Sequence, residues 1–240
     1  MFGIISGSGL YEMVRGEERK IITPFGEADV TLGAVQGKPL AFIARHGKSH
    51  TLPPHKVNYR ANIYALNTLR VQGIIATSAC GVIDRFEPGD LILPDDFIAL
   101  TLGPVTFFDD FQAGIKHIDL TSPFDENLAS AVKSAARAEG VEIKSGGTIA
   151  TVPGPRFETR AEIGALKKMG ASLVSMTQAY EAILARELDI KFASLAIATN
   201  YACGVSKKPL DYEEARALAG KKEDDIKRII ARLVGTGGIE

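Results

Sequence analysis

The sequence predicts an α/β protein that forms a single domain around a central sheet covered by helices. Two observations support this prediction: short apolar, β-branched segments recur along the chain, and amphipathic helical patterns lie between several of them. Strands that alternate with helices favour a sheet that is buried on both faces. No linker, repeat or low-complexity segment divides the 240 residues, so we expect one domain over residues 1–240.

The predicted strands are short and are bounded by glycine, proline or polar residues. They cover residues 3–6, 28–32, 40–44, 73–77, 91–93, 147–152, 173–175 and 193–199. The predicted helices cover residues 58–69, 126–139, 160–169, 178–188 and 211–233. In the last helix the apolar residues recur at helical spacing, so one face should pack on the core.

The composition excludes several classes of protein. Lys plus Arg is 28 and Asp plus Glu is 29, and the net charge of −1 argues against a dedicated binder of nucleic acid or of an anionic membrane. No apolar run approaches the roughly 20 residues that cross a bilayer, and the N-terminus lacks the pattern of a signal peptide. The two cysteines, Cys80 and Cys203, lie far apart and show no metal-ligand spacing. We therefore expect a cytoplasmic protein without a metal.

In an α/β sheet, ligands bind at the carboxyl ends of the strands, where loops hold polar groups on a rigid frame. Ser-Gly-Ser-Gly-Leu at 6–10 follows the first strand; its glycines let backbone amides approach an anion, and the Ser8 hydroxyl adds a donor. This segment matches neither a dinucleotide-binding fingerprint nor a Walker A loop. Arg45 follows the third strand with a planar fork of donors, and His46 and His50 lie nearby. Alone, these segments would also fit a tight turn and a polar surface.

Two further strand ends carry hydroxyl groups. Ser78 and Ala79 follow the fourth predicted strand, where a hydroxyl and backbone N–H groups would face a ligand. Thr177 follows another strand beside Met176, whose flexible side chain packs well against a sugar or a base. No base is assigned to Cys80, so we interpret this residue as a buried structural thiol rather than a nucleophile. Each segment alone would also fit an ordinary turn or the core.

Two more segments carry groups that suit a flat heterocycle. Phe157 would stack on a ring, and the adjacent Glu158 would accept N–H donors from the edge of that ring. Glu158 would equally cap the helix that follows. Asn200 lies at the end of the last predicted strand and offers both a donor and an acceptor, which suits a lactam edge. A plain turn residue would look the same.

In order along the chain, these six segments resemble the nucleoside phosphorylase family that contains purine nucleoside phosphorylase and methylthioadenosine phosphorylase. The similarity runs from Gly3 to about Gly204 and includes a further block, Pro-His-Lys-Val-Asn-Tyr-Arg-Ala-Asn, at 54–62. Any one motif alone is weak evidence for the family, but six motifs in the same order along the chain are specific for it. The resemblance implies a single α/β domain with a central mixed sheet flanked by helices and a homotrimer or homohexamer. It also implies phosphorolysis of a nucleoside to a free base and a ribose 1-phosphate.

The resemblance also implies roles for individual residues. The phosphate site would contain Ser8, Arg45, His46, Ser78, the backbone of Ala79, and Thr177. The nucleoside would contact Phe157, Glu158, Met176, Asn200, Ala202 and Leu210. His117 lies in a stretch that in relatives reaches the pocket of a neighbouring subunit, and His50 matches a histidine that lines the site in some members.

The implied mechanism needs no metal, no organic cofactor and no covalent nucleophile from the protein. Inorganic phosphate is the co-substrate; held by Arg45 and His46, it attacks the sugar and balances the positive charge that develops there. The leaving purine gains negative charge, which Asn200 would stabilise by donating near N7. These three residues are the predicted catalytic groups.

Departures from relatives indicate the substrate. Relatives that act on 6-aminopurines typically carry Asp in place of Asn200 and of Ala202, whereas Glu158 with Asn200 is the pairing of 6-oxopurine enzymes. No histidine follows Asn200, and Leu210 offers an apolar wall at the start of the final helix. We therefore predict phosphorolysis of 5′-methylthioinosine to hypoxanthine and 5-methylthioribose 1-phosphate. The alternatives are 5′-methylthioadenosine, inosine or guanosine as the substrate, or a purine-binding protein without catalysis. Tyr180 stands where the family usually has proline, and the sequence offers no functional reason for it.

Overall fold

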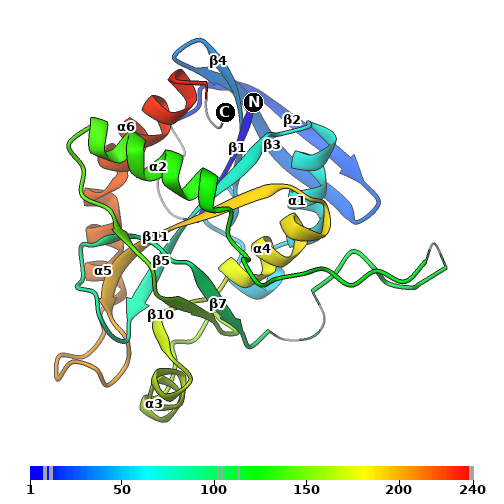
Figure 1. Cartoon of the computed structure of the whole chain (residues 1–240). Helices are drawn as coiled ribbons and strands as arrows, with labels where there is room; N and C mark the ends of the chain where they lie inside the picture. The colour runs from blue at the N-terminus through cyan, green and yellow to red at the C-terminus, as the bar shows by residue number, and fades with distance from the viewer. Residues whose placement is uncertain (8–9, 11–12, 102, 104, 113, 238–240) are drawn as a thin grey trace.

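The computed structural model describes residues 1–7, 10, 13–101, 103, 105–112 and 114–237. In these residues, eleven strands form one mixed sheet that is flanked by helices (Figure 1). The strands are β1 (Phe2–Ser6), β2 (Gly16–Thr23), β3 (Gly26–Val35), β4 (Lys38–Ala44), β5 (Gly73–Val82), β6 (Leu91–Leu93), β7 (Asp96–Ala99), β8 (Lys144–Ser145), β9 (Thr148–Thr151), β10 (Ala171–Ser175) and β11 (Lys191–Tyr201). The helices are α1 (Tyr59–Thr68), α2 (Glu126–Ala138), α3 (Arg160–Lys168), α4 (Gln178–Glu187), α5 (Tyr212–Lys221), α6 (Glu223–Gly235) and the short 3-10 helix η1 (Pro54–Lys56).

β5 is the strand at which the sheet branches. Along one path the order is β2-β3-β4-β1-β5-β10-β9-β7, while β11 pairs with β5 and with β6, and β6 pairs with β8. β5 runs parallel to β1 and β11 and antiparallel to β10. The central mixed sheet that the resemblance implied is therefore confirmed.

Alternating residues of the central strands fill apolar cores on both faces of the sheet. Ile5 and Ile74 belong to the core that includes α1 and α4, whereas Ile4 and Ile75 belong to the core that includes α2 and α6. A third, smaller core holds Ile163 of α3 against β9 and β10. The predicted α/β fold with helices on both faces is confirmed.

β2, β7 and β8 escape the sequence prediction. β2 has the sequence GEERKIIT, lies at the end of the strand order and is exposed over most of its length, so it shows no apolar pattern. It is held as a strand by continuous antiparallel pairing with β3. β7 and β8 are 4 and 2 residues long, and unlike the similarly short β6 and β9 they are not buried along their length.

The prediction of one helix over residues 211–233 is wrong, because the chain forms two helices that meet at Lys222. Acidic residues fill the first turn of α6 and Lys221 ends α5, and both arrangements stabilise separate helix termini. Two helices can follow the surface of the sheet where one straight helix would leave it: α5 packs Ala219 inward, and α6 packs Ile226 and Ile230 beside α2. No helix of the described chain is long and apolar enough to cross a membrane.

Candidate active site

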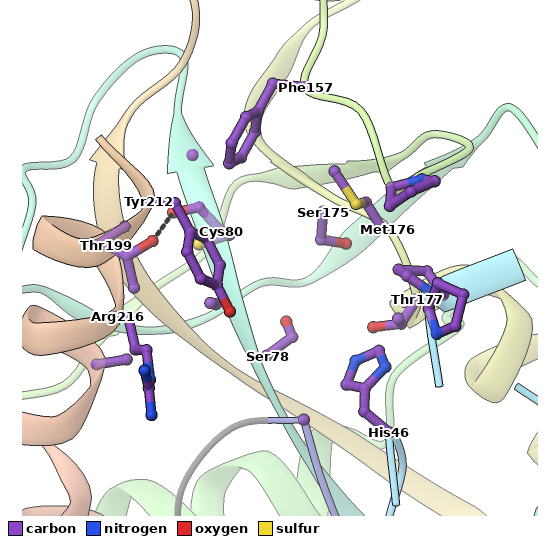
Figure 2. Close-up of a pocket in the computed structure, with 18 of the residues that line it drawn as sticks. His46, Ser78, Cys80, Phe157, Ser175, Met176, Thr177, Thr199, Tyr212 and Arg216 are labelled. Atoms are coloured by element: carbon purple, nitrogen blue, oxygen red, sulfur yellow. Dashed lines mark hydrogen bonds between the residues drawn. The ribbon is translucent and has the colours of Figure 1, made fainter. Parts of the chain in front are cut away.

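The carboxyl-terminal parts of several strands, together with the segments that follow them, surround a cavity of about 560 Å³ (Figure 2). Because β1, β4, β5 and β11 run parallel, the segments after them lie at the same edge of the sheet. The cavity brings together most of the residues that the sequence selected: Arg45, His46, His50, Ser78, Ala79, Phe157, Glu158, Met176, Thr177 and Asn200. Ser8 lies outside the described residues, and the adjacent Gly7 lines the cavity.

β10 reaches the same cavity although it runs antiparallel to β5. The pairing of Val174 with Gly81 sends the residues after Val174 back along β5, in the direction of Ser78. The hydroxyls of Ser78 and Thr177 consequently face the space into which His46 also points (Figure 2). Hydroxyl and imidazole groups from β5 and from the segments after β4 and β10 thus converge on one volume.

A buried ion pair holds Arg45 in place. Its Nε and Nη2 atoms donate to the carboxylate of Glu181 at 2.5 and 2.7 Å, and Nη1 donates to the Thr77 carbonyl at 3.0 Å. Both charged side chains are 1% exposed. Burial raises the pKa of the Glu181 carboxyl, and the guanidinium opposes that shift. A methyl group on Gly7 would come within 2.7 Å of Nη1, so glycine leaves room for the Arg45 head.

Glu181, the partner of Arg45, is a residue that the sequence analysis did not indicate. It lies in the first turn of α4, 136 positions from Arg45 along the chain. An acid in a helix carries no local signal of so distant a partner. Its only sequence clue is the position on an inward-facing helix side, where an unpaired charge would be costly.

His46 is a neutral histidine near pH 7. Desolvation and, next, the charge of Arg45 lower the pKa of His46 from 6.5 to about 4. Its Nδ1 lies 2.8 Å from the Leu52 carbonyl oxygen, which can only accept, so Nδ1 carries the proton and Nε2 presents a lone pair. In this form His46 can accept a hydrogen bond from a protonated phosphate oxygen. The described residues contain no group of three or more His, Cys, Asp or Glu side chains that could hold a metal ion.

Three consecutive residues of β5 play different parts in the wall. Ser78 Oγ is buried and has no hydrogen-bond partner among the described residues, so it is available to a ligand. Ala79 is exposed toward the cavity. The Cys80 Sγ donates to the Ile197 carbonyl at 3.4 Å, and burial raises the pKa of its thiol far above the ordinary value. These observations favour the interpretation of Cys80 as a structural thiol.

Phe157 and His46 lie at opposite ends of the cavity in Figure 2. Near Phe157, Glu158 is 8% exposed, and burial raises the pKa of its carboxyl. The Thr199 hydroxyl lies 2.8 Å from Asn200 Oδ1 and 3.3 Å from the Cys80 carbonyl oxygen, and it donates to the nearer of the two. One Nδ2 hydrogen goes to the carbonyl of the next residue at 2.9 Å, and the second remains for a ligand. Thr199, which the sequence did not select, therefore fixes the amide orientation.

Three residues predicted to bind the nucleoside do not line the cavity of this chain. Ala202 is 2% exposed and packs behind Gly81, because its N–H donates to the Val82 carbonyl at 2.8 Å. Leu210 belongs to the loop before α5, and it is the helix rather than the loop that faces the cavity. His117 lies on an exposed segment, where its ring meets Phe111 edge to face at a centroid distance of 5.9 Å.

One face of α5 forms a wall that the sequence did not predict. Tyr212, Ala215, Arg216 and Ala219 line the cavity. Their spacing of three and four residues places them on one side of the helix. The sequence predicted only that the apolar face of this helix, which includes Ala215, would pack on the core.

Tyr180 supports another part of the wall from behind. Its ring stacks on Tyr59 with centroids 4.6 Å apart and planes inclined by 9°. The Tyr59 hydroxyl donates to the Pro54 carbonyl at 2.9 Å, and Pro54 lines the cavity. The aromatic ring at position 180 thus helps to position the segment that carries Pro54.

The chain matches the family described as the phosphorylase superfamily over residues 2–235. It is 44% identical to the 6-oxopurine nucleoside phosphorylase of Pyrococcus furiosus, with 96% of this chain and 91% of that protein covered. It is 39% identical to a probable S-methyl-5′-thioinosine phosphorylase of Methanopyrus kandleri, with 97% and 91% covered. It is 41% identical to an S-methyl-5′-thioadenosine phosphorylase of Thermofilum pendens, with 97% and 90% covered.

Among solved structures, the chain is similar to methylthioadenosine phosphorylase from Schistosoma mansoni in complex with adenine. The TM-score is 0.90 at 31% identity, with 98% of this chain and 91% of that chain covered. The chain therefore belongs to the phosphorylase superfamily. The nucleoside phosphorylase family and the pentosyltransferase class of enzyme that the motifs indicated are confirmed.

Proposed function

We propose that this enzyme catalyses the phosphorolysis of 6-oxopurine nucleosides, with inorganic phosphate as the co-substrate. The observation that carries the proposal is the presence of Glu158 and Asn200 in the same cavity as Arg45 and His46. Relatives named as 6-oxopurine nucleoside and methylthioinosine phosphorylases support it. We place the enzyme in the cytoplasm, where the free thiols of Cys80 and Cys203 would stay reduced.

Phosphate would bind at the end of the cavity that holds Arg45 and His46. The Arg45 guanidinium supplies the positive charge, and its pairing with Glu181 keeps it oriented without reorganisation during the reaction. His46 Nε2 accepts a hydrogen bond from the protonated oxygen of a monohydrogen phosphate, and Ser78 Oγ donates to another oxygen. The bound phosphate then attacks C1′ of the sugar while the bond from C1′ to the purine breaks, and the sugar passes through a cation-like state.

The base would bind between Phe157, Glu158 and Asn200. Hypoxanthine carries a hydrogen on N1, which the Glu158 carboxylate accepts, whereas adenine would turn the lone pair of its N1 toward that carboxylate. Asn200 Nδ2 donates to O6 or N7 of a 6-oxopurine and stabilises the negative charge on the leaving base. Each mismatched buried polar group costs about 1–3 kcal/mol, so 6-oxopurines should be strongly preferred.

The test is a substrate panel. Purified protein is incubated with inosine, guanosine, 5′-methylthioinosine, adenosine and 5′-methylthioadenosine, with and without phosphate, and the free base is measured. We expect release of 6-oxopurines only with phosphate, at a kcat/KM at least about tenfold above that of the 6-amino partners. Equal efficiency on methylthioinosine and methylthioadenosine would contradict the base assignment. Binding of purine without any turnover would indicate a binding protein instead.

A substitution at Asn200 sharpens this test. Asn200→Asp replaces a donor by an acceptor, so activity on inosine should fall and activity on adenosine should rise relative to it, by about tenfold in the ratio. Asn67→Asp, on α1 and outside the cavity, is the matched control and should leave the ratio unchanged.

We also infer a homotrimer or homohexamer. Residues 105–112 and 114–118 project from the body of the molecule (Figure 1) and include Phe111 and Ile115, which are 52% and 74% exposed. Exposed apolar side chains on a projecting segment suit a contact with another copy, which would bring His117 near the neighbouring cavity. Light scattering after size exclusion should give three or six chains, and Phe111→Asp with Ile115→Asp should dissociate them. A monomeric wild-type enzyme would contradict the inference.

A further inference from the structure

The wall formed by α5 brings a charged side chain to the cavity where the sequence led us to expect an apolar one. Leu210 does not line the cavity, whereas Arg216 does, one helical turn after Tyr212. In Figure 2, Tyr212 and Arg216 lie on the side of the cavity opposite Met176 and Thr177. The 5′-methylthio preference predicted from Leu210 therefore loses the contact on which it rested.

Arg216 is not committed to a tight ion pair. Its Nη1 lies 3.6 Å from Glu213 Oε2, beyond ordinary hydrogen-bond distance, and its side chain is 68% exposed. His50 also lines the cavity, and burial and then the Arg216 charge lower the pKa of His50, which indicates that the two groups lie near each other. The guanidinium consequently has donors to offer at this side of the cavity.

The 5′-substituent is the part of the nucleoside to which no residue has yet been assigned, and Arg216 lies on the side of the cavity where we place it. With the phosphate at the Arg45 end and the base near Phe157 and Asn200, the sugar spans the space between them. Phosphate attacks C1′ from the face opposite the base, which is also the face of the 2′- and 3′-hydroxyls. The 5′-carbon leaves the ring on the other face, away from the phosphate. α5 forms the wall opposite Met176 and Thr177, and we place the 5′-carbon on that side.

Building on the proposed function, we propose that Arg216 selects the 5′-substituent by donating a hydrogen bond to a 5′-hydroxyl, so that inosine and guanosine are preferred over 5′-methylthioinosine. A hydroxyl oxygen is a good acceptor for a guanidinium, whereas a thioether sulfur is a weak one. A methylthio group placed against Arg216 would also strip water from the charge without replacing it. The selection is a matter of charge and hydrogen bonding rather than of size.

The experiment compares three nucleosides in wild type and variants. We measure kcat/KM for inosine, 5′-deoxyinosine and 5′-methylthioinosine, together with the KM for phosphate. The wild type should prefer inosine over both others by about tenfold, the lower end for a hydrogen bond to a charged group that is partly exposed. Arg216→Leu should shift the ratio of methylthioinosine to inosine upward by about tenfold or more, and Arg216→Lys should retain most of the preference.

Arg137→Leu, at an exposed arginine on α2 outside the cavity, is the matched control and should change neither ratio.

A wild-type preference for methylthioinosine, or an unchanged ratio in Arg216→Leu, would overturn the proposal while leaving 6-oxopurine phosphorolysis intact. A large rise in the phosphate KM of Arg216→Leu at an unchanged ratio would also overturn it, because Arg216 would then serve the phosphate. Failure of the proposed function itself would appear differently, as no phosphate-dependent release of base from any of the three nucleosides. The wild-type comparison of inosine with 5′-deoxyinosine tests the hydrogen bond even where a variant does not fold.

Discussion

Arg45 and Arg216 line the same cavity but are held in opposite ways. Arg45 is 1% exposed and donates two hydrogen bonds to Glu181 at 2.5 and 2.7 Å. Arg216 is 68% exposed, and its contact with Glu213 is 3.6 Å long. Identical guanidinium groups are therefore in one case a buried, paired part of the protein and in the other an exposed part of its surface.

The difference shows how burial assigns a role to a charge. A buried, paired cation is already oriented when substrate arrives, so it can act on the reacting phosphate without reorganisation, but its loss leaves the partner unpaired. An exposed arginine contributes little to stability and can be exchanged at small cost. Residues of the first kind should affect turnover and folding together, and residues of the second kind should affect selectivity alone.

The largest effect is expected for Arg45→Ala. Removing a charge-assisted donor costs about 1.5–3 kcal/mol, which lowers kcat/KM for phosphate by roughly 10- to 100-fold. Glu181 would also remain buried without its partner, so the free energy of unfolding should fall by about 3–5 kcal/mol. Phosphate kinetics and urea unfolding measure both effects, and Arg216→Ala should show neither. Near-normal activity of Arg45→Ala at low phosphate would contradict the contrast between the two arginines.

Glu181→Gln tests whether the partner positions Arg45. The amide keeps the shape but removes the charge, so the guanidinium is held less firmly and the free energy of unfolding should fall by about 1–3 kcal/mol. The phosphate KM should rise several-fold, while kcat at saturating phosphate changes less. Glu213→Gln, the equivalent change beside Arg216, should alter neither quantity. An unchanged phosphate KM in a folded Glu181→Gln enzyme would show that the ion pair serves stability only.

His46 should make stability depend on pH. Because the pKa of His46 is lowered from 6.5 to about 4, the unfolded chain takes up a proton between these values that the folded protein does not. Stability from this group is complete above pH 6.5 and is lost as the pH falls toward 4, by about 2–3 kcal/mol. Urea unfolding of the wild type and of His46→Asn at pH 7, 5.5 and 4.5 measures the difference. Equal pH slopes in the two proteins would be inconsistent with a buried neutral His46.

The smallest effect is expected for Cys80→Ser, which changes a buried group without a charge. The serine hydroxyl can take over the hydrogen bond to the Ile197 carbonyl, and the thiol has no chemical role. Turnover should stay within about twofold of wild type, and stability should change by about 1 kcal/mol or less. A folded but inactive Cys80→Ser enzyme would show that the thiol participates in the reaction.

Local patterns in the sequence were sufficient to predict most of the strands and many of the residues that line the cavity. Eight strands were predicted from apolar runs, because the central strands are buried on both faces and show it directly. Arg45, Ser78 and Asn200 could be selected because they follow predicted strands and strand ends in this class of fold meet at one edge, although β5 and β11 continue to Val82 and Tyr201. β2 could not be predicted, since pairing with β3 rather than its own side chains makes it a strand.

The sequence by itself therefore determined the fold class and the groups at the predicted strand ends, which depend on local patterns, and the family, which depends on the order of six motifs along the chain. The tertiary structure decided which groups are partners. The pairing of Arg45 with Glu181, the break at Lys222 and the choice of Arg216 over Leu210 as a cavity residue each depend on contacts between distant segments. A helix of given sequence has the same faces wherever it lies, but only its packing on the sheet decides which face meets the substrate.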